Sequence, residues 1–226
     1  MSFKILLVSL FLVAVVNSKS CKLSEHIVKK EHKWKIDPPQ NIYGNQSVDE
    51  SHIRTWKETK DSKTKLEESI NQQVNRELFA QYTYMSMAAH FSRDDNYLPG
   101  FAKFFRESAE EEQKHAMLFM EYQNKRGGRV KLNAIRHPCR DQWGNGLTAM
   151  KEALLLEKTI YQSLLDVHKV ADDAKDPQMM DFLESNFLGE QIDAIKQLGN
   201  YIGTLSRLGD GLGEYQFDKV TLGGGK

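Results

Sequence analysis

The chain has 226 residues, of which 40% are hydrophobic and 27% charged, so it can bury a substantial core in one domain with extensions. Its 31 lysines and arginines equal its 31 aspartates and glutamates, and this balance argues against nucleic acid or an anionic membrane as a partner. Only five prolines interrupt the chain, and they lie between long segments of helical periodicity. The predicted class is all-α.

Residues 1–20 have the pattern of a secretory signal peptide. Lys4 precedes an apolar run from Ile5 to Val16, and small residues follow it. This run is too short for a membrane span, and a buried N-terminal helix is the less favoured alternative. No later segment is apolar enough to cross a bilayer, so we expect a mature protein that is secreted or lies in the secretory pathway.

Residues 21–61 are expected to form a polar N-terminal extension, because they are densely charged, lack periodicity and contain Pro38-Pro39. Asn45 begins the glycosylation sequon Asn-Gln-Ser, and the sequence leaves its use open. The two cysteines are Cys21 and Cys139. They can bridge to each other, bridge to another subunit or remain free thiols, although free thiols are disfavoured outside the cytosol.

Helical periodicity then predicts four long helices and a terminal stub, at about 63–92, 99–125, 145–173, 177–208 and 214–222. The break between the first two helices is so short that they must run antiparallel. Between the second and third, roughly 18 residues can reach about 60 Å at about 3.3 Å each. A helix of about 27 residues measures only about 40 Å. The connection can therefore cross the whole bundle, so the third helix can start where the second starts.

Each of the four predicted long helices has an apolar face, and each of these faces carries a polar or charged residue at a position expected to lie in the core. These residues are Glu77 in the first helix, Glu112 and His115 in the second, Glu157 in the third and Gln191 in the fourth. A buried carboxylate is costly unless it is paired or binds a metal. Three buried carboxylates at the same depth in the bundle therefore argue for a bound cation. Glu112 and His115 also form the Glu-x-x-His unit that holds iron or manganese inside four-helix bundles. For each residue alone, solvent exposure or a hydrogen bond between helices is the alternative.

Carboxylate oxygens with a single imidazole suit iron or manganese. A symmetric di-iron bundle would repeat Glu-x-x-His on the fourth helix, where this chain has Gln191 without a following histidine. We therefore expect a stronger position formed by Glu77, Glu112 and His115. A weaker position is shared by Glu112, Glu157 and Gln191. This asymmetry favours metal that reacts and leaves over a permanently held cofactor.

Local motifs extend from this polar layer across residues 62–222. They are Asn75-Arg76-Glu77-Leu78, Tyr82 to Met87, Glu111-Glu112 with His115-Ala116, Gln123 to Arg129, Leu156-Glu157-Lys158, Asp176-Pro177, Asp181-Phe182 with Glu184, Glu190-Gln191 and Glu214 to Lys219. Together they make residues 62–226 resemble a ferritin of the heavy, iron-oxidising type. The resemblance implies a ferritin-like four-helix bundle with a long crossover and a short fifth C-terminal helix.

The resemblance also implies roles for individual residues. Glu77, Glu112, His115, Glu157 and Gln191 correspond to ferroxidase ligands, which hold two irons transiently. Tyr84 corresponds to the tyrosine beside them. The implied entrance pore comprises His168, Asp181 and Glu184, and the acids implied in transfer and nucleation of the mineral are Glu107, Glu110 and Glu111.

The implied function is oxidation of Fe(II) with O₂ and storage as ferric oxyhydroxide in a cage of twenty-four subunits, alone or mixed with a light-type subunit. The signal peptide and extension resemble the secreted ferritins of invertebrates. One alternative is a non-catalytic storage or carrier subunit, which would be expected to lack ligands. Another is a secreted four-helix signalling protein, which would not need polar residues at matching depth. Val220 stands near the implied four-fold pore, where many heavy chains carry histidine.

Overall fold

The computed structural model describes residues 60–223, with side chains from Lys65 onward. In chain order it contains α2 (Lys60–Phe91), η1 (Asp94–Asn96), α3 (Pro99–Lys125), α4 (Gly146–Asp173), α5 (Pro177–Leu183), η2 (Glu184–Leu188), α6 (Gly189–Leu208), α7 (Leu212–Gln216) and η3 (Phe217–Thr221). The all-α prediction is confirmed. Within this part of the chain, no helix is both long and apolar enough to span a membrane. The predicted signal peptide and residues 21–59 of the predicted extension, including Cys21 and Asn45, lie outside the described residues. Lys60 and Asp61, predicted to end the extension, already belong to α2.

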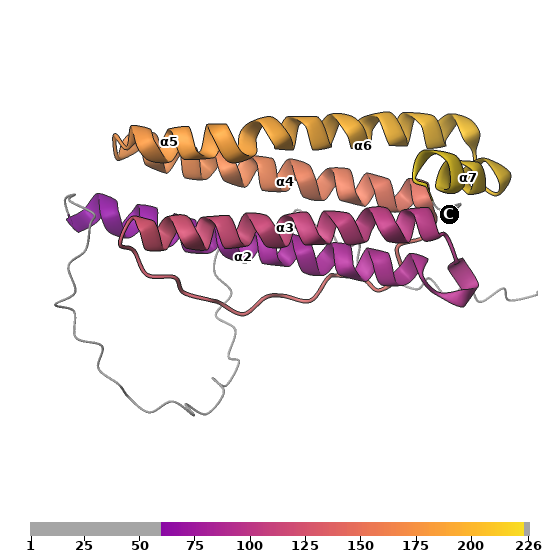
Figure 1. Ribbon diagram of the computed structural model, residues 1–226, viewed down its shortest axis with the longest axis horizontal. Helices are drawn as coiled ribbons and strands as arrows, with labels where there is room; N and C mark the ends of the chain where they lie inside the picture. The colour runs from indigo at the N-terminus through magenta and orange to yellow at the C-terminus, as the bar shows by residue number, and fades with distance from the viewer. Residues whose placement is uncertain (1–59, 224–226) are drawn as a thin grey trace, which may run out of the picture.

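The helices form a bundle in which α2 and α3 run antiparallel side by side, next to α4 and the continuous path of α5, η2 and α6 (Figure 1). The connection between α3 and α4 runs along the bundle, so α4 begins at the end where α3 begins (Figure 1). The predicted crossover is confirmed. Hydrogen bonds fix the connection to α2: Asn71 bonds to the backbone of Arg129 and Lys131, and the Trp143 indole donates to Ser86 Oγ at 3.0 Å. Cys139, also in the connection, is disulfide-bonded.

Local capping explains where the long helices begin and end. Pro99 occupies the first turn of α3, and Gly127, with φ of +76°, follows its end. The side chain of Asn145 accepts a hydrogen bond from the Thr148 backbone N–H at the start of α4. Asp176 does the same for α5 by accepting from Met179 N–H. These signals depend on near neighbours in the chain, so the sequence predicted them closely.

The predicted fourth helix differs from the structure, because the π-helical turn η2 interrupts it between α5 and α6. In a regular α-helix each step of four residues overshoots a full turn by about 40°, so Gln191 would be rotated by about 80° from Leu183. A π turn is wider and absorbs part of this rotation. As a result Leu183, Phe187 and Gln191 are all buried. The Asn186 side-chain amide donates to the Phe182 carbonyl at 2.7 Å and supports this turn.

The C-terminal stub begins earlier than predicted, at Leu212, and its second half is the π turn η3. Two of its acids cap other helices. Asp218 is fully buried and accepts from the Phe101 backbone N–H at 3.0 Å, in the first turn of α3. Glu214 accepts from the Gly146 N–H at the start of α4. Negative charge at these helix N-termini is favourable and stabilises the packing of α7 and η3 against the end of the bundle.

Asp176→Ala is expected to lower the free energy of unfolding by about 2–4 kcal/mol, since it removes a helix cap and one partner of a buried ion pair. Asp176 is 3% exposed, and its carboxylate lies 2.6 Å from the guanidinium of Arg126, the residue that follows the end of α3. Chemical denaturation would measure the loss. Asp173→Ala is the matched control, because the exposed Lys169–Asp173 pair should contribute less than about 1 kcal/mol. Equal losses in both variants would contradict the assignment.

Candidate metal centre

The helices α2 and α3 bring Glu77, Glu112 and His115 together inside the bundle. Each residue offers one ligand atom, and these atoms all lie within 4.8 Å of one another. Glu77 is fully buried and Glu112 is 4% exposed. Among the described side chains, Glu77 Oε2 and Glu112 Oε2 are buried without a hydrogen-bond partner. Two such oxygens beside an imidazole are costly on their own and suit a bound cation.

Glu157 from α4 and Gln191 from α6 face this cluster as a second group. The Gln191 side-chain nitrogen donates to the Glu157 carboxylate and, at 3.1 Å, to the Glu157 backbone carbonyl. The Tyr84 hydroxyl donates to the other carboxylate oxygen of Glu157. Neutral donors therefore satisfy Glu157, whereas Glu77 and Glu112 each keep one oxygen without a hydrogen bond. That oxygen of Glu112 lies 3.5 Å from His115 Nδ1. This difference agrees with the expected asymmetry between a stronger and a weaker metal position.

Burial dominates the electrostatics of all three carboxyl groups. It raises the pKa of Glu77 well above its usual value, and the charge of Glu112 adds to the effect. It also raises the pKa of Glu112 well above its usual value, with a further contribution from Glu157. The pKa of Glu157 is raised by burial too, although hydrogen bonds from Tyr84 and Gln191 oppose the shift. The site therefore favours protons when no metal is bound, and a cation must displace them.

Tyr84 is buried and contacts both Glu157 and the aromatic core. Burial raises the pKa of its hydroxyl well above the usual value, and the neighbouring Glu157 carboxylate raises it further. The phenol therefore stays protonated and remains a donor to Glu157. Its ring stacks on Phe105, with ring centroids 6.0 Å apart, which holds the hydroxyl in place.

A cavity of about 460 Å³ leads from the cluster to the surface of α3 and α6. The residues predicted to transfer or nucleate mineral, Glu107, Glu110 and Glu111, all line it. Glu112 of the metal cluster and Glu157 of the facing group line it as well. Burial raises the pKa of Glu111, and a hydrogen bond shared with Glu190 adds to this shift. An acidic passage therefore starts at the candidate metal centre.

Two side chains that the sequence did not single out contact the cluster. Glu190 Oε2 lies 3.5 Å from His115 Nε2, and the Gln73 amide donates to Glu77 Oε1 at 2.7 Å. The available signals were weak. Gln73 precedes Glu77 by one helical turn, which places both on one face of α2. Glu190 adjoins Gln191 in sequence, but an exposed acid on a helix usually only contacts water.

The residues of the predicted entrance pore lie elsewhere, on α4, α5 and η2. His168 Nε2 lies 2.7 Å from Glu184 Oε1, and Asp181 is exposed one helical turn before Ser185. The structure pairs His168 with Glu184 rather than with the metal cluster. These groups form a separate polar surface.

Comparison with known proteins decides the family to which this bundle and its acidic cluster belong. Residues 67–208 match the ferritin family, described as a ferritin-like domain. The chain belongs to the ferritin family. Soma ferritin of Lymnaea stagnalis is 58% identical over 156 residues, which are 69% of this chain and 90% of that protein.

Two further ferritins are similar over nearly the same length. The middle subunit of Salmo salar ferritin is 55% identical over 161 residues, covering 70% of this chain and 92% of that protein. The middle subunit of Aquarana catesbeiana ferritin is 55% identical over 159 residues, covering 69% of this chain and 90% of that protein. The predicted membership of the ferritin family is confirmed, and ferritins bind and store iron in multi-subunit cages.

The donor set of this ferritin fits its iron cargo. Carboxylate oxygens suit both Fe(II) and Fe(III), and imidazole is a common ligand of iron in proteins. The cluster Glu77, Glu112 and His115 combines both donor types and carries the free oxygens that a cation needs.

Proposed function

We propose that this ferritin oxidises Fe(II) to Fe(III) with O₂ at the cluster of Glu77, Glu112 and His115, and deposits the product as ferric oxyhydroxide inside a cage of its subunits. The observation that carries the proposal is the pair of buried carboxylate oxygens, one on Glu77 and one on Glu112, that have no hydrogen bond and lie beside His115. Family membership supports iron storage, and the complete set of candidate ligands supports catalysis by this chain. The proposed assembly has twenty-four subunits, and its proposed location is the secretory pathway.

In this proposal Glu77 and His115 bind the first Fe(II), and Glu112 bridges it to a second Fe(II) held with Glu157 and Gln191. Each iron gives one electron, and O₂ accepts both together with two protons from water to form hydrogen peroxide. The anionic ligands stabilise the added ferric charge, and the protons that metal displaces from the carboxyl groups leave the site. Gln191 is neutral, so it stabilises the second ferric ion less and favours its release.

Release follows the acidic cavity. Glu107, Glu110 and Glu111 line it next to Glu112, so they offer successive carboxylates to a departing Fe(III). In the assembled cage these acids would nucleate the mineral at the inner surface.

The test is to mix metal-free protein with Fe(II) in air while recording O₂ uptake and ferric absorbance. A catalytic subunit should oxidise the first added iron much faster than buffer does. Saturation with Zn²⁺ beforehand should remove this fast phase, because a redox-inert cation then occupies the ligands. Oxidation at the rate of buffer alone would favour the non-catalytic storage or carrier subunit instead.

The pore residues give a further prediction. Asp181→Ala/Glu184→Ala is expected to slow the initial oxidation by the assembled protein by about 3- to 10-fold at low salt, because the carboxylates concentrate Fe(II). The difference should shrink as ionic strength rises, since salt screens exposed charges. Stopped-flow absorbance at several salt concentrations measures both effects. Asp94→Ala/Asp95→Ala removes two exposed acids from η1, at the other end of the bundle from α5, and should leave the rate unchanged (Figure 1).

A further inference from the structure

Gln73 is a fully buried glutamine that contacts Glu77 of the candidate metal centre. It lies on α2, and its side-chain nitrogen donates to Glu77 Oε1 at 2.7 Å. The other oxygen, Glu77 Oε2, is the one without a partner. The amide therefore occupies one carboxylate oxygen and leaves the second for a cation. A ligand held in this way loses little side-chain freedom when metal binds.

Two neighbouring donors fix which end of the Gln73 amide faces Glu77. The Arg76 guanidinium donates to Gln73 Oε1 at 3.3 Å, and the Ser163 hydroxyl of α4 lies 2.9 Å from the same oxygen. The Ser163 hydroxyl has one hydrogen, and the Ile160 carbonyl at 2.7 Å competes with Gln73 Oε1 for it. When that hydrogen goes to Ile160, the Arg76 guanidinium still donates to Gln73 Oε1. A flipped amide would place its oxygen against the Glu77 carboxylate and its nitrogen against Arg76. Both contacts would be unfavourable.

We propose that Gln73, oriented by Ser163 and Arg76, is a positioning residue that aims Glu77 Oε2 at the stronger iron position. This inference rests on the proposed function of the cluster. Its effect is selective, because Gln73 bonds to Glu77, whereas Glu157 is held by Tyr84 and Gln191. Loss of Gln73 should therefore weaken one of the two metal positions.

Zn²⁺ titration of the assembled, metal-free protein by calorimetry tests this role without any redox step. Gln73→Met keeps the length of the side chain but removes its donor. It is expected to weaken the tighter Zn²⁺ binding step by about 10- to 100-fold, the usual cost of losing an outer partner of a ligand. The weaker step should be unchanged. Unchanged affinity at the tighter step would overturn the proposal.

Gln123→Met is the matched control, because Gln123 is also a fully buried glutamine. Its amide nitrogen donates to the Glu67 backbone carbonyl at 2.8 Å, outside the metal cluster. The control should lose thermal stability but keep both Zn²⁺ binding steps. If it weakened the tighter step as much as Gln73→Met, a general packing defect would explain both variants and the positioning role would be rejected.

A second pair of variants serves if Gln73→Met fails to fold. Ser163→Ala removes one donor to the Gln73 amide and should weaken the tighter step severalfold, whereas Ser163→Thr keeps a hydroxyl and should retain the affinity. Equal affinities in these two variants would contradict the role of Ser163. The proposed function fails separately: it falls if the wild-type protein binds Zn²⁺ in two steps yet oxidises Fe(II) no faster than buffer.

Discussion

Glu112→Ala/His115→Ala is expected to lower the initial rate of Fe(II) oxidation by at least about 100-fold, since loss of an outer partner alone can cost 10- to 100-fold. The double variant removes the proposed bridging carboxylate and the imidazole of the stronger position. Glu77 would then be the last protein ligand of the three-residue cluster. Rapid O₂ uptake and ferric absorbance measure the loss.

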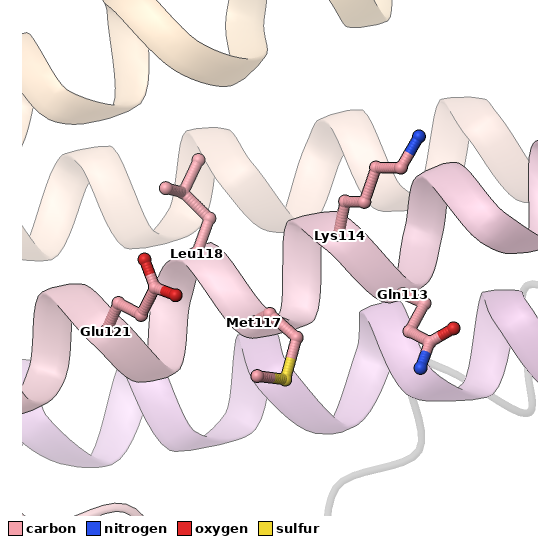
Figure 2. A pocket seen from close by; sticks show the side chains of 5 residues that line it. All are labelled: Gln113, Lys114, Met117, Leu118 and Glu121. Atoms are coloured by element: carbon pink, nitrogen blue, oxygen red, sulfur yellow. The ribbon is translucent and has the colours of Figure 1, made fainter.

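Gln113→Ala/Glu121→Ala is the control for this variant, because both residues are exposed on the same helix. Figure 2 shows them beside Lys114, Met117 and Leu118 around a separate pocket on α3. The control should oxidise Fe(II) at the wild-type rate. Fast oxidation retained by Glu112→Ala/His115→Ala would place the reaction elsewhere. Slow oxidation in the wild type as well would favour a storage subunit that depends on a catalytic partner.

Glu112→Gln is expected to stabilise the metal-free protein, and increasingly so as the pH rises. Burial holds the pKa of Glu112 well above the value of about 4.3 that an unfolded chain has. A group with a raised pKa contributes stability that is fully present below its unfolded pKa and is lost as the pH rises through its folded pKa. Glutamine has nearly the same shape as glutamate but does not ionise. The melting temperature of Glu112→Gln should therefore exceed that of the wild type by an amount that grows by several degrees from mildly acidic to mildly alkaline buffer.

With Zn²⁺ added, the wild-type protein should become more stable than Glu112→Gln. Metal binds the deprotonated carboxylate and stabilises the native state, so the wild-type protein should gain most at the higher pH. The variant should gain much less, because it has lost the shared ligand. If the wild-type and variant melting curves shifted in parallel over the whole pH range, Glu112 would not be the buried proton-holding group that the structure indicates.

The sequence by itself determined the all-α class, the order of the long helices and the faces that carry the polar layer. These depend on local chemistry: Pro99, Gly127 and Asp176 set helix ends through their own backbone and near neighbours. Periodicity then placed Glu77 and Glu112 on inward faces, because the position of a residue around a helix follows from its spacing along the chain. The length of the crossover permitted the connection that the structure contains.

Only the tertiary structure decided which polar groups pair across helices. Tyr84 bonds to Glu157 over a separation of 73 residues, and Ser163 to Gln73 over 90. The wide turn η2 and the buried position of Asp218 were also absent from the predictions. Spacing gives the face of a helix, but the depth of a side chain, its rotamer and the identity of its partner depend on how neighbouring helices pack. That packing brings Ser163 of α4 to the Gln73 amide, which holds one oxygen of Glu77 and leaves the other without a hydrogen bond.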